Sequence, residues 1–324
     1  YYKKNNLVKN KHTQYYKRWL RNLSRETLEI QNIKSKNSNQ WECIGPWDFD
    51  INAQSRSYAP GAAHLYTIEQ SVSNNNVLYA GSATAGAWRS DNKGDNWRLI
   101  TQSLHLSGVY AIEIDHQNED IIYISGNGRV YKSLNGGLLW SIVGDPIFNG
   151  QSHSIKDIKM HPQNNQILFI ASDQGLYKST NAGNTFTEIM SGEFQEIEFH
   201  PLSADTMYFI KKDANYTEFY RSDNNGNTIN QFSNGWPSPS INDEQKRTEI
   251  AVSIASPNKI VALATGSANG GSGLYGIYIS YDKGENWIFR CCGPQPAGTP
   301  NANNINMMGW QPSGLDDGGQ YYYD

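Results

Sequence analysis

The chain has 324 residues, a formal net charge of −4 and no run of about 18 apolar residues, so we expect no membrane-spanning helix. Charged residues make up 18% of the chain and hydrophobic residues 38%, with 29 Gly, 20 Tyr and 9 Trp. The length suffices for one large domain. Low charge with many Gly, Asn and aromatic residues is typical of a β-rich extracellular protein.

Residues 1–40 form a basic leader with ten Lys/Arg and two Glu. Apolar side chains recur there at roughly helical spacing, which predicts a partly helical segment. One interpretation is that the leader lies on the acidic remainder of the chain. The other is a basic arm for nucleic acid or anionic surface glycans. Because the remainder has no recognised nucleic-acid motif, we expect no nucleic-acid partner.

From residue 41 to residue 324 the chain is dominated by one phrase that occurs five times. The phrase reads Ser-x-Asn/Asp-x-Gly-x-x-aromatic, and Ile229 replaces the aromatic residue in the fourth copy. Its members are Ser90, Asn92, Gly94, Trp97; Ser133, Asn135, Gly137, Trp140; Ser179, Asn181, Gly183, Phe186; Ser222, Asn224, Gly226; and Ser280, Asp282, Gly284, Trp287. A period in the forties, with one longer interval, indicates a repeat architecture.

The residue types of the phrase predict a self-closing β-turn. Asn or Asp can hydrogen-bond the backbone two residues on, Ser can bond the turn backbone, and Gly permits a positive φ. The alternative is that these Asp and Asn side chains bind a metal or a substrate. Active sites are rarely copied five times, which favours the structural interpretation.

Each phrase follows two short apolar strands and an earlier turn. The turns include Asp115–Asn118 and His161–Asn164, and the strands after them include Ile121–Tyr123 and Ile167–Phe169. Short strands bounded by Asn, Gly and Ser predict an all-β fold, a β-propeller of four-stranded blades with five complete repeats and the start of another. We interpret the Gly-rich segment 266–273 as an insertion in a blade loop.

The phrase resembles the Asp-box, or bacterial neuraminidase repeat, and its spacing is most similar to sortilin-type propellers. The whole chain resembles large secreted surface proteins of Bacteroidota, through Trp41–Trp47, Asn304–Trp310 and Asp316–Tyr323. The resemblance implies a secreted or cell-surface location, export by a type IX secretion system, and further C-terminal modules.

Several residues outside the phrase are candidates for ligand or metal binding. Asp316 and Asp317 precede two glycines and could ligate calcium or serve as cleft carboxylates, or simply form a solvated turn. Otherwise we expect no cofactor. Trp236 and Trp310 could stack on sugar rings or pack against loops. The three cysteines allow a disulfide from Cys43 to Cys292 or to its neighbour Cys291, or three free thiols.

These features predict a non-catalytic binding or structural module with a protein or glycan partner at the cell surface. A glycoside hydrolase of the sialidase or xyloglucanase type on the same fold is the alternative, because fold alone does not decide function. Two carboxylates outside the repeat that converge in one cleft would favour the enzyme. A third hypothesis is an assembly subunit that polymerises through blade edges or the leader.

Overall fold

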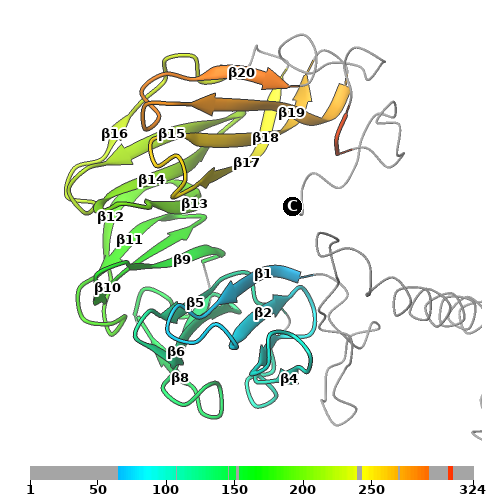
Figure 1. Cartoon of the computed structure of the whole chain (residues 1–324), viewed down its shortest axis with the longest axis vertical. Helices are drawn as coiled ribbons and strands as arrows, with labels where there is room; N and C mark the ends of the chain where they lie inside the picture. The colour runs from blue at the N-terminus through cyan, green and yellow to red at the C-terminus, as the bar shows by residue number, and fades with distance from the viewer. Residues whose placement is uncertain are drawn as a thin grey trace, which may run out of the picture. The chain divides into compact units, whose positions relative to one another are not determined.

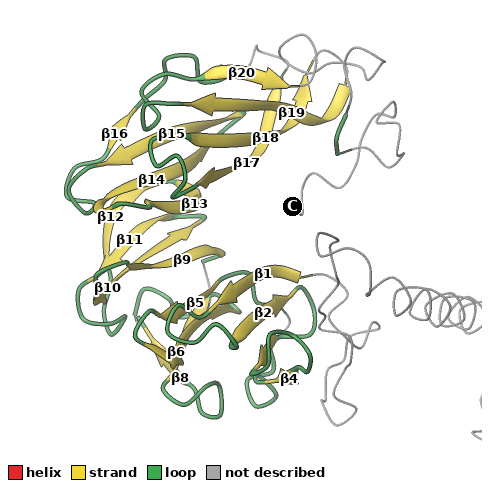
Figure 2. Cartoon of the chain, viewed as in Figure 1, coloured by secondary structure: helices red, strands yellow, loops and turns green. Residues whose placement is uncertain are grey.

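The computed structural model describes residues 65–106, 108–144, 146–150, 153–238, 243–268, 271–291 and 306–308. The chain divides into two compact units, Tyr1–Cys43 and Ile44–Asp324, and all described residues belong to the second. They form strands and turns, and none of them is helical (Figure 2). This part of the chain therefore contains no helix that could cross a membrane. The basic leader predicted over residues 1–40 lies outside the described residues.

Within these ranges twenty strands form five antiparallel sheets of four, and consecutive strands are neighbours in every sheet (Figure 1). We call the sheets blades 1 to 5. Blades 1 and 2 contain β1 (Leu65–Gln70), β2 (Leu78–Ser82), β3 (Ala87–Ser90), β4 (Arg98–Leu99); and β5 (Ile112–Asp115), β6 (Asn118–Gly126), β7 (Arg129–Ser133), β8 (Ser141–Val143). Blades 3 and 4 contain β9 (Ile155–His161), β10 (Asn164–Ser172), β11 (Gly175–Ser179), β12 (Thr187–Ser191); and β13 (Glu193–His200), β14 (Ser203–Asp213), β15 (Tyr216–Ser222), β16 (Asn230–Gln231). Blade 5 contains β17 (Glu244–Val252), β18 (Ile260–Ala268), β19 (Gly271–Ser280) and β20 (Ile288–Cys291).

Neighbouring blades pack against each other through their inner strands. The first strands lie side by side in the order β1, β5, β9, β13 and β17 (Figure 1). Second strands are covered on both faces, which explains their continuous apolar runs; all five residues of β2 are buried. The hydrophobic clusters span two blades, as where Tyr123 of blade 2 packs with Leu168 and Phe186 of blade 3. The predicted four-stranded blades are confirmed, and the described residues form a five-bladed β-propeller.

The repeat turns are the eight-residue segments that begin at Ser90, Ser133, Ser179, Ser222 and Ser280, and each joins the third strand of a blade to the fourth. Ser179 Oγ accepts hydrogen bonds from Gly183 N at 3.0 Å and Asn181 N at 3.3 Å, and donates to Asn181 Oδ1 at 3.0 Å. Asn181 Oδ1 also accepts one from Thr185 N at 2.9 Å. The other four turns repeat these bonds, with Ser–Gly distances of 2.8 to 2.9 Å. The five turns are therefore self-closed.

The Gly-rich segment 266–273 is not the loop insertion that the sequence suggests. It forms the end of the β18–β19 hairpin, where Gly266 pairs with Gly273 and Ala268 with Gly271. A Cβ atom at Gly266 would collide with the Glu244 carbonyl oxygen of β17. Since glycine lacks that atom, three strands can approach closely, and residues 266–268 and 271–273 extend β18 and β19 instead of forming a loop.

A cation at the end of the third strand ties blades 2, 3 and 4 to the next repeat turn. Lys132 Nζ donates to the Ala182 carbonyl at 3.1 Å, and Lys178 Nζ to the Asn225 carbonyl at 2.6 Å. Arg221 Nη1 donates to the Lys283 carbonyl at 3.1 Å. Each acceptor is the fourth residue of its repeat turn, so a fixed position in one blade holds a fixed position in the next.

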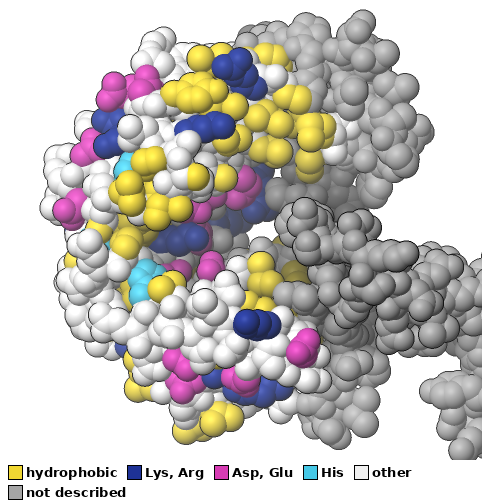
Figure 3. All heavy atoms as spheres, viewed as in Figure 1, with side chains coloured by type: hydrophobic (Ala, Val, Ile, Leu, Met, Phe, Trp, Pro, Cys, Tyr) yellow, Lys and Arg dark blue, Asp and Glu magenta, His cyan; other side chains and the backbone are white. Residues whose placement is uncertain are grey.

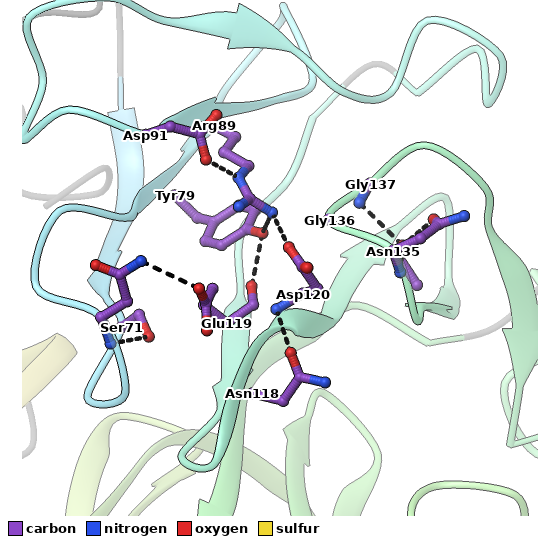
Figure 4. Close-up of polar contacts among 12 residues, drawn as sticks. Ser71, Tyr79, Arg89, Asp91, Asn118, Glu119, Asp120, Asn135, Gly136 and Gly137 are labelled. Carbon is purple, nitrogen blue, oxygen red and sulfur yellow. Dashed lines mark hydrogen bonds and ion pairs between the residues drawn. The ribbon is translucent and has the colours of Figure 1, made fainter.

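The junction between blades 1 and 2 uses an arginine and a carboxylate for the same purpose. Arg89 is nearly buried and donates to Tyr79 Oη at 2.7 Å, Asp91 Oδ1 at 2.6 Å and Asp120 Oδ1 at 2.5 Å (Figure 4). The Asp120 carbonyl in turn accepts a hydrogen bond from Gly136 N of the repeat turn at 2.9 Å. In blade 5 the equivalent residue is Ile279, which cannot make this bond.

Candidate binding site on the first strands

The first strands place four charged side chains at one register position. Glu69, Glu113, Lys159 and Glu198 pair with Tyr79, Tyr123, Phe169 and Tyr208 of the second strands. Each of these four partners in turn pairs with the residue just before the repeat Ser of its blade. Ala251 holds this position in blade 5. Because first strands of neighbouring blades are adjacent, these side chains share one surface of the propeller.

Lys159 is the cation at the centre of this group. Its Nζ lies 3.9 Å from Glu198 Oε1, and 24% of its side chain is exposed. The neighbouring Asp157 carboxylate raises the pKa of Lys159 well above its usual value, and Glu198, Glu113 and Glu69 act in the same direction against the effect of burial. We call Glu69, Glu113, Asp157, Lys159 and Glu198 the carboxylate–lysine cluster.

Two carboxylates of this cluster are fixed by backbone amides of the next blade. Glu113 Oε1 accepts a hydrogen bond from Met160 N at 2.9 Å, and Asp157 Oδ2 accepts one from Ile197 N at 3.1 Å. These bonds run across the blade boundary, because acceptor and donor lie on adjacent first strands. They hold the two carboxylates in one orientation.

The same kind of hydrogen bond, from a backbone amide to a carboxylate, also occurs at the boundary between blades 4 and 5. Glu196 Oε2 accepts a hydrogen bond from Ile250 N at 2.6 Å, and the Glu196 side chain is buried. Burial, followed by the nearby Glu249 carboxylate, raises the pKa of Glu196 well above its usual value. The series of carboxylate-to-amide bonds therefore joins the first strands of blades 2 to 5.

Within the described strands Glu69 and Glu198 accept no such amide bond, and the pKa of each carboxyl group is raised. Burial is the main cause that raises the pKa of Glu69 from 4.5 to about 7, and the Glu113 carboxylate adds to it. Burial also raises the pKa of Glu198 to about 7, while Lys159 opposes the increase. Both groups are therefore partly protonated near neutral pH, so each can donate or accept a hydrogen bond.

Aromatic and apolar side chains lie on β1 and just before β5. Tyr66 of β1 stacks on Tyr110, with ring centroids 4.5 Å apart and an interplanar angle of 19°, and Tyr110 is 49% exposed. Leu65 and Ile68 of β1 are also exposed. In the space-filling view, Lys, Arg, Asp and Glu side chains gather around the hollow at the middle of the molecule (Figure 3). A surface with charged groups and an aromatic face suits a polar ligand that has an apolar side.

One residue proposed from the sequence as a ligand-binding aromatic is in the core. Trp236 is 8% exposed, and its Nε1 donates to the Thr217 carbonyl at 2.6 Å. Its ring packs on Phe219 and Trp287 with centroids 5.6 and 4.6 Å away. Of the two roles that the sequence leaves open for Trp236, sugar stacking or packing, the structure shows packing.

The other candidate residues from the sequence lie outside the described part of the chain, except Cys291. Asp316, Asp317, Trp310, Cys43 and Cys292 are outside the described residues, so their roles stay predictions. Cys291 is disulfide-bonded. Across the residues that the structure describes, no group of three or more His, Cys, Asp or Glu side chains is arranged to hold a metal ion.

Sequence reasoning missed the carboxylate–lysine cluster, because its members lie in strands outside the repeated phrase. An alignment of the five first strands on their buried partners would have revealed it. That alignment gives Glu, Glu, Lys, Glu and Ala at one position, and these polar residues occupy the innermost strands of the blades.

Comparison with known proteins identifies the fold. No protein-family model and no curated protein matches the sequence. Among solved structures, the chain is similar to an ancestral GH74 enzyme, with 16% identity and a TM-score of 0.55 over 75% of this chain and 35% of that one. It is also similar to the GH74 enzyme of Niastella koreensis, with 18% identity and a TM-score of 0.57 over 78% and 41% of the two chains. A weaker match is YCF48 from Cyanidioschyzon merolae, with 11% identity and a TM-score of 0.43 over 72% and 86% of the two chains.

At these identities the likeness to the GH74 enzymes extends to the propeller fold alone. The chain spans well under half of the length of either GH74 enzyme.

Proposed function

We propose that this chain is a non-catalytic binding module that holds a protein or glycan partner on the surface formed by its first strands. The observation that carries the proposal is the use of the inner carboxylates. Glu113 and Asp157 bond backbone amides of the neighbouring blade, and Glu198 faces Lys159. Carboxylates engaged in this way support a rigid, charged recognition surface. They are poorly suited to act as nucleophile or base.

We further propose that the module is secreted or exposed at the cell surface. The resemblance to Asp-box propellers of secreted Bacteroidota proteins supports a secreted or cell-surface module, delivered by a type IX secretion system and followed by further modules. A propeller suits that role, because rigid blades hold variable residues at fixed positions. Secretion is tested by fractionating cells that express the complete natural protein and locating the chain with an antibody.

Glycoside hydrolysis is the second candidate, and one observation favours it. A general acid for glycoside cleavage needs a carboxyl group whose pKa lies near neutral pH, and the pKa values of Glu69 and Glu198 are both raised to about 7. The similarity to GH74 propellers adds a scaffold on which such chemistry is known. The enzyme hypothesis then requires one of these two residues to be essential.

Both functions are tested together on a polysaccharide array that reports retention and released sugars. We expect retention without cleavage, and a loss of at least tenfold in retention for Lys159→Met and Tyr110→Ala. Glu188→Gln, on the exposed outer strand β12, is the control and keeps wild-type binding. Cleavage that disappears in Glu198→Gln or Glu69→Gln contradicts the non-catalytic proposal. If no polysaccharide is retained, the glycan form of the proposal fails, and the same variants are then tested on protein partners.

A further inference from the structure

The repeat turn of blade 2 differs from its four counterparts in what it presents to solvent. Its second, sixth and seventh residues are Leu134, Leu138 and Leu139, which are 65%, 69% and 73% exposed. The residues at these positions in the other turns are Asp91, Asp95 and Asn96; Thr180, Asn184 and Thr185; Asp223, Asn227 and Thr228; and Tyr281, Glu285 and Asn286. Among these twelve only Tyr281 is aromatic, and none is aliphatic.

The turn does not need the leucines in order to close. Ser133 Oγ accepts a hydrogen bond from Gly137 N at 2.9 Å, and Asn135 Oδ1 accepts one from Leu139 N at 2.8 Å. Turns with Asn and Thr at the sixth and seventh positions make the same bonds through the same backbone atoms. Three exposed leucines in one turn are therefore unexplained by the fold of the blade, and exposed apolar patches often mark interaction sites.

The strand that follows this turn, β8, lies at the edge of its sheet and carries no charged side chain. β8 is the last strand of its sheet and has only β7 as a paired neighbour in the described part of the chain. It contains Ser141, Ile142 and Val143, and Ile142 is 48% exposed. The outer strands of the other blades each carry a charged or amide side chain, as in Arg98, Glu188, Gln231 and Arg290. Such side chains normally prevent an edge strand from pairing with another chain.

We propose that blade 2 carries a self-association surface, made of Leu134, Leu138, Leu139 and Ile142, whose occupant is a second copy of this chain. Two β8 edges pair antiparallel about a twofold axis, with Ile142 opposite Ile142 and Ser141 opposite Val143 of the other copy. The same patch then serves both copies, as an isologous contact requires. The apolar turns extend the contact beyond the short strand.

The absence of charge on this patch favours a second copy as the occupant. The four side chains of the patch are uncharged, so two copies meet without repulsion between like charges. Pairing of β4, β12 or β20 with its own copy would instead bring Arg98, Glu188 or Arg290 toward the same residue of the other chain, which is unfavourable. Self-pairing is thus compatible with β8 and disfavoured at those three edges. This inference is independent of the binding surface on the first strands.

The contact is small, so we expect reversible association. Four side chains and a three-residue strand bury on the order of a few hundred Å² per copy, below the roughly 800 Å² of a standard stable interface. We therefore expect weak association, with a dissociation constant between roughly 1 μM and 1 mM. Multiple copies on one surface would strengthen it through effective concentration.

The test is sedimentation equilibrium of the full chain up to about 1 mM, with far-UV circular dichroism of each variant to verify the fold. We expect a monomer–dimer equilibrium in the wild type. The triple variant Leu134→Thr, Leu138→Asn, Leu139→Thr reproduces the blade 3 turn and should weaken dimerisation at least tenfold with little change in Tm. A wild type that stays monomeric at the highest concentration, or a triple variant that associates as the wild type does, overturns the proposal.

A charge pair at the twofold axis tests the register independently of the leucines. Ile142→Lys and Ile142→Glu should each be monomeric, because two like charges would face each other. An equimolar mixture of the two should dimerise again. If the mixture stays monomeric while both variants are folded, or if either single variant dimerises as the wild type does, the proposed pairing of β8 with β8 is wrong.

Discussion

Replacing Glu198 by Gln should change the pH dependence of stability, because ionisation of this partly buried carboxyl group destabilises the folded protein. Its pKa is raised from 4.5 to about 7, and 28% of the side chain is exposed. Between these two values the folded protein keeps a proton that the unfolded chain releases, so stability falls as the pH rises from about 4.5 to 7. The shift corresponds to about 3 kcal/mol as an upper limit. Partial exposure and screening by solvent reduce the expected effect to about 1–2 kcal/mol.

The sign of the effect can be measured by urea unfolding at several pH values. The free energy of unfolding of Glu198→Gln relative to the wild type should increase from pH 4.5 to pH 7 and stay constant above pH 7.5. The change arises in the wild type, because its folded state is destabilised when Glu198 ionises. The amide of the variant does not ionise. Glu188→Gln on outer strand β12 should show no such trend. A difference between Glu198→Gln and the wild type that is independent of pH would refute the assignment of a strained carboxyl group beside Lys159.

Three further substitutions test the devices that hold the blades together, by urea unfolding and thermal unfolding. Arg89→Met removes three hydrogen bonds at a nearly buried guanidinium and should cost about 1.5–3 kcal/mol, whereas Arg89→Lys, the residue found in blades 2 and 3, should cost less than half of that. Ser179→Ala leaves two backbone amides of its turn without their acceptor and should cost about 1–3 kcal/mol; a loss below about 0.5 kcal/mol would contradict the self-closed turn. Gly226→Ala should cost at least about 2 kcal/mol, because φ is 76° and the new Cβ would lie 2.9 Å from the Phe169 ring; a neutral result would mean that the turn can shift.

The fold was predictable from the sequence because its signal is repeated. A single Ser-x-Asn-x-Gly phrase is a weak indication of a turn, but five copies with short strands between them leave few architectures. The Gly-rich segment 266–273 was misread, since composition cannot tell a loop from a hairpin in which glycine lets strands approach. The sequence left two roles open for Trp236, because the direction of its side chain depends on packing between blades 4 and 5, which local residue types do not report.

The carboxylate–lysine cluster could not be predicted from the sequence, for a different physical reason. Glu69, Lys159 and Glu198 are at least 39 residues from one another in sequence, so their proximity depends on the blade register. A charged residue in a strand is also most often a solvated one, and only the position of these strands at the inner side of the blades removes their solvent. Burial and mutual charge then give the residues properties that their identities alone do not predict.

A repeat protein offers an internal comparison that can separate structure from function. Positions that agree in all five blades, such as the Ser and Gly of the repeat turns, close the same hydrogen bonds each time and are explained by the fold. Positions at which one blade departs need another explanation, because the other copies show that the fold does not require the departure. Lys159, which stands where blades 1, 2 and 4 have glutamate and blade 5 has Ala251, is one such departure, and the leucines of the blade 2 turn are another. They mark two separate surfaces, so variants of one should leave the properties of the other unchanged.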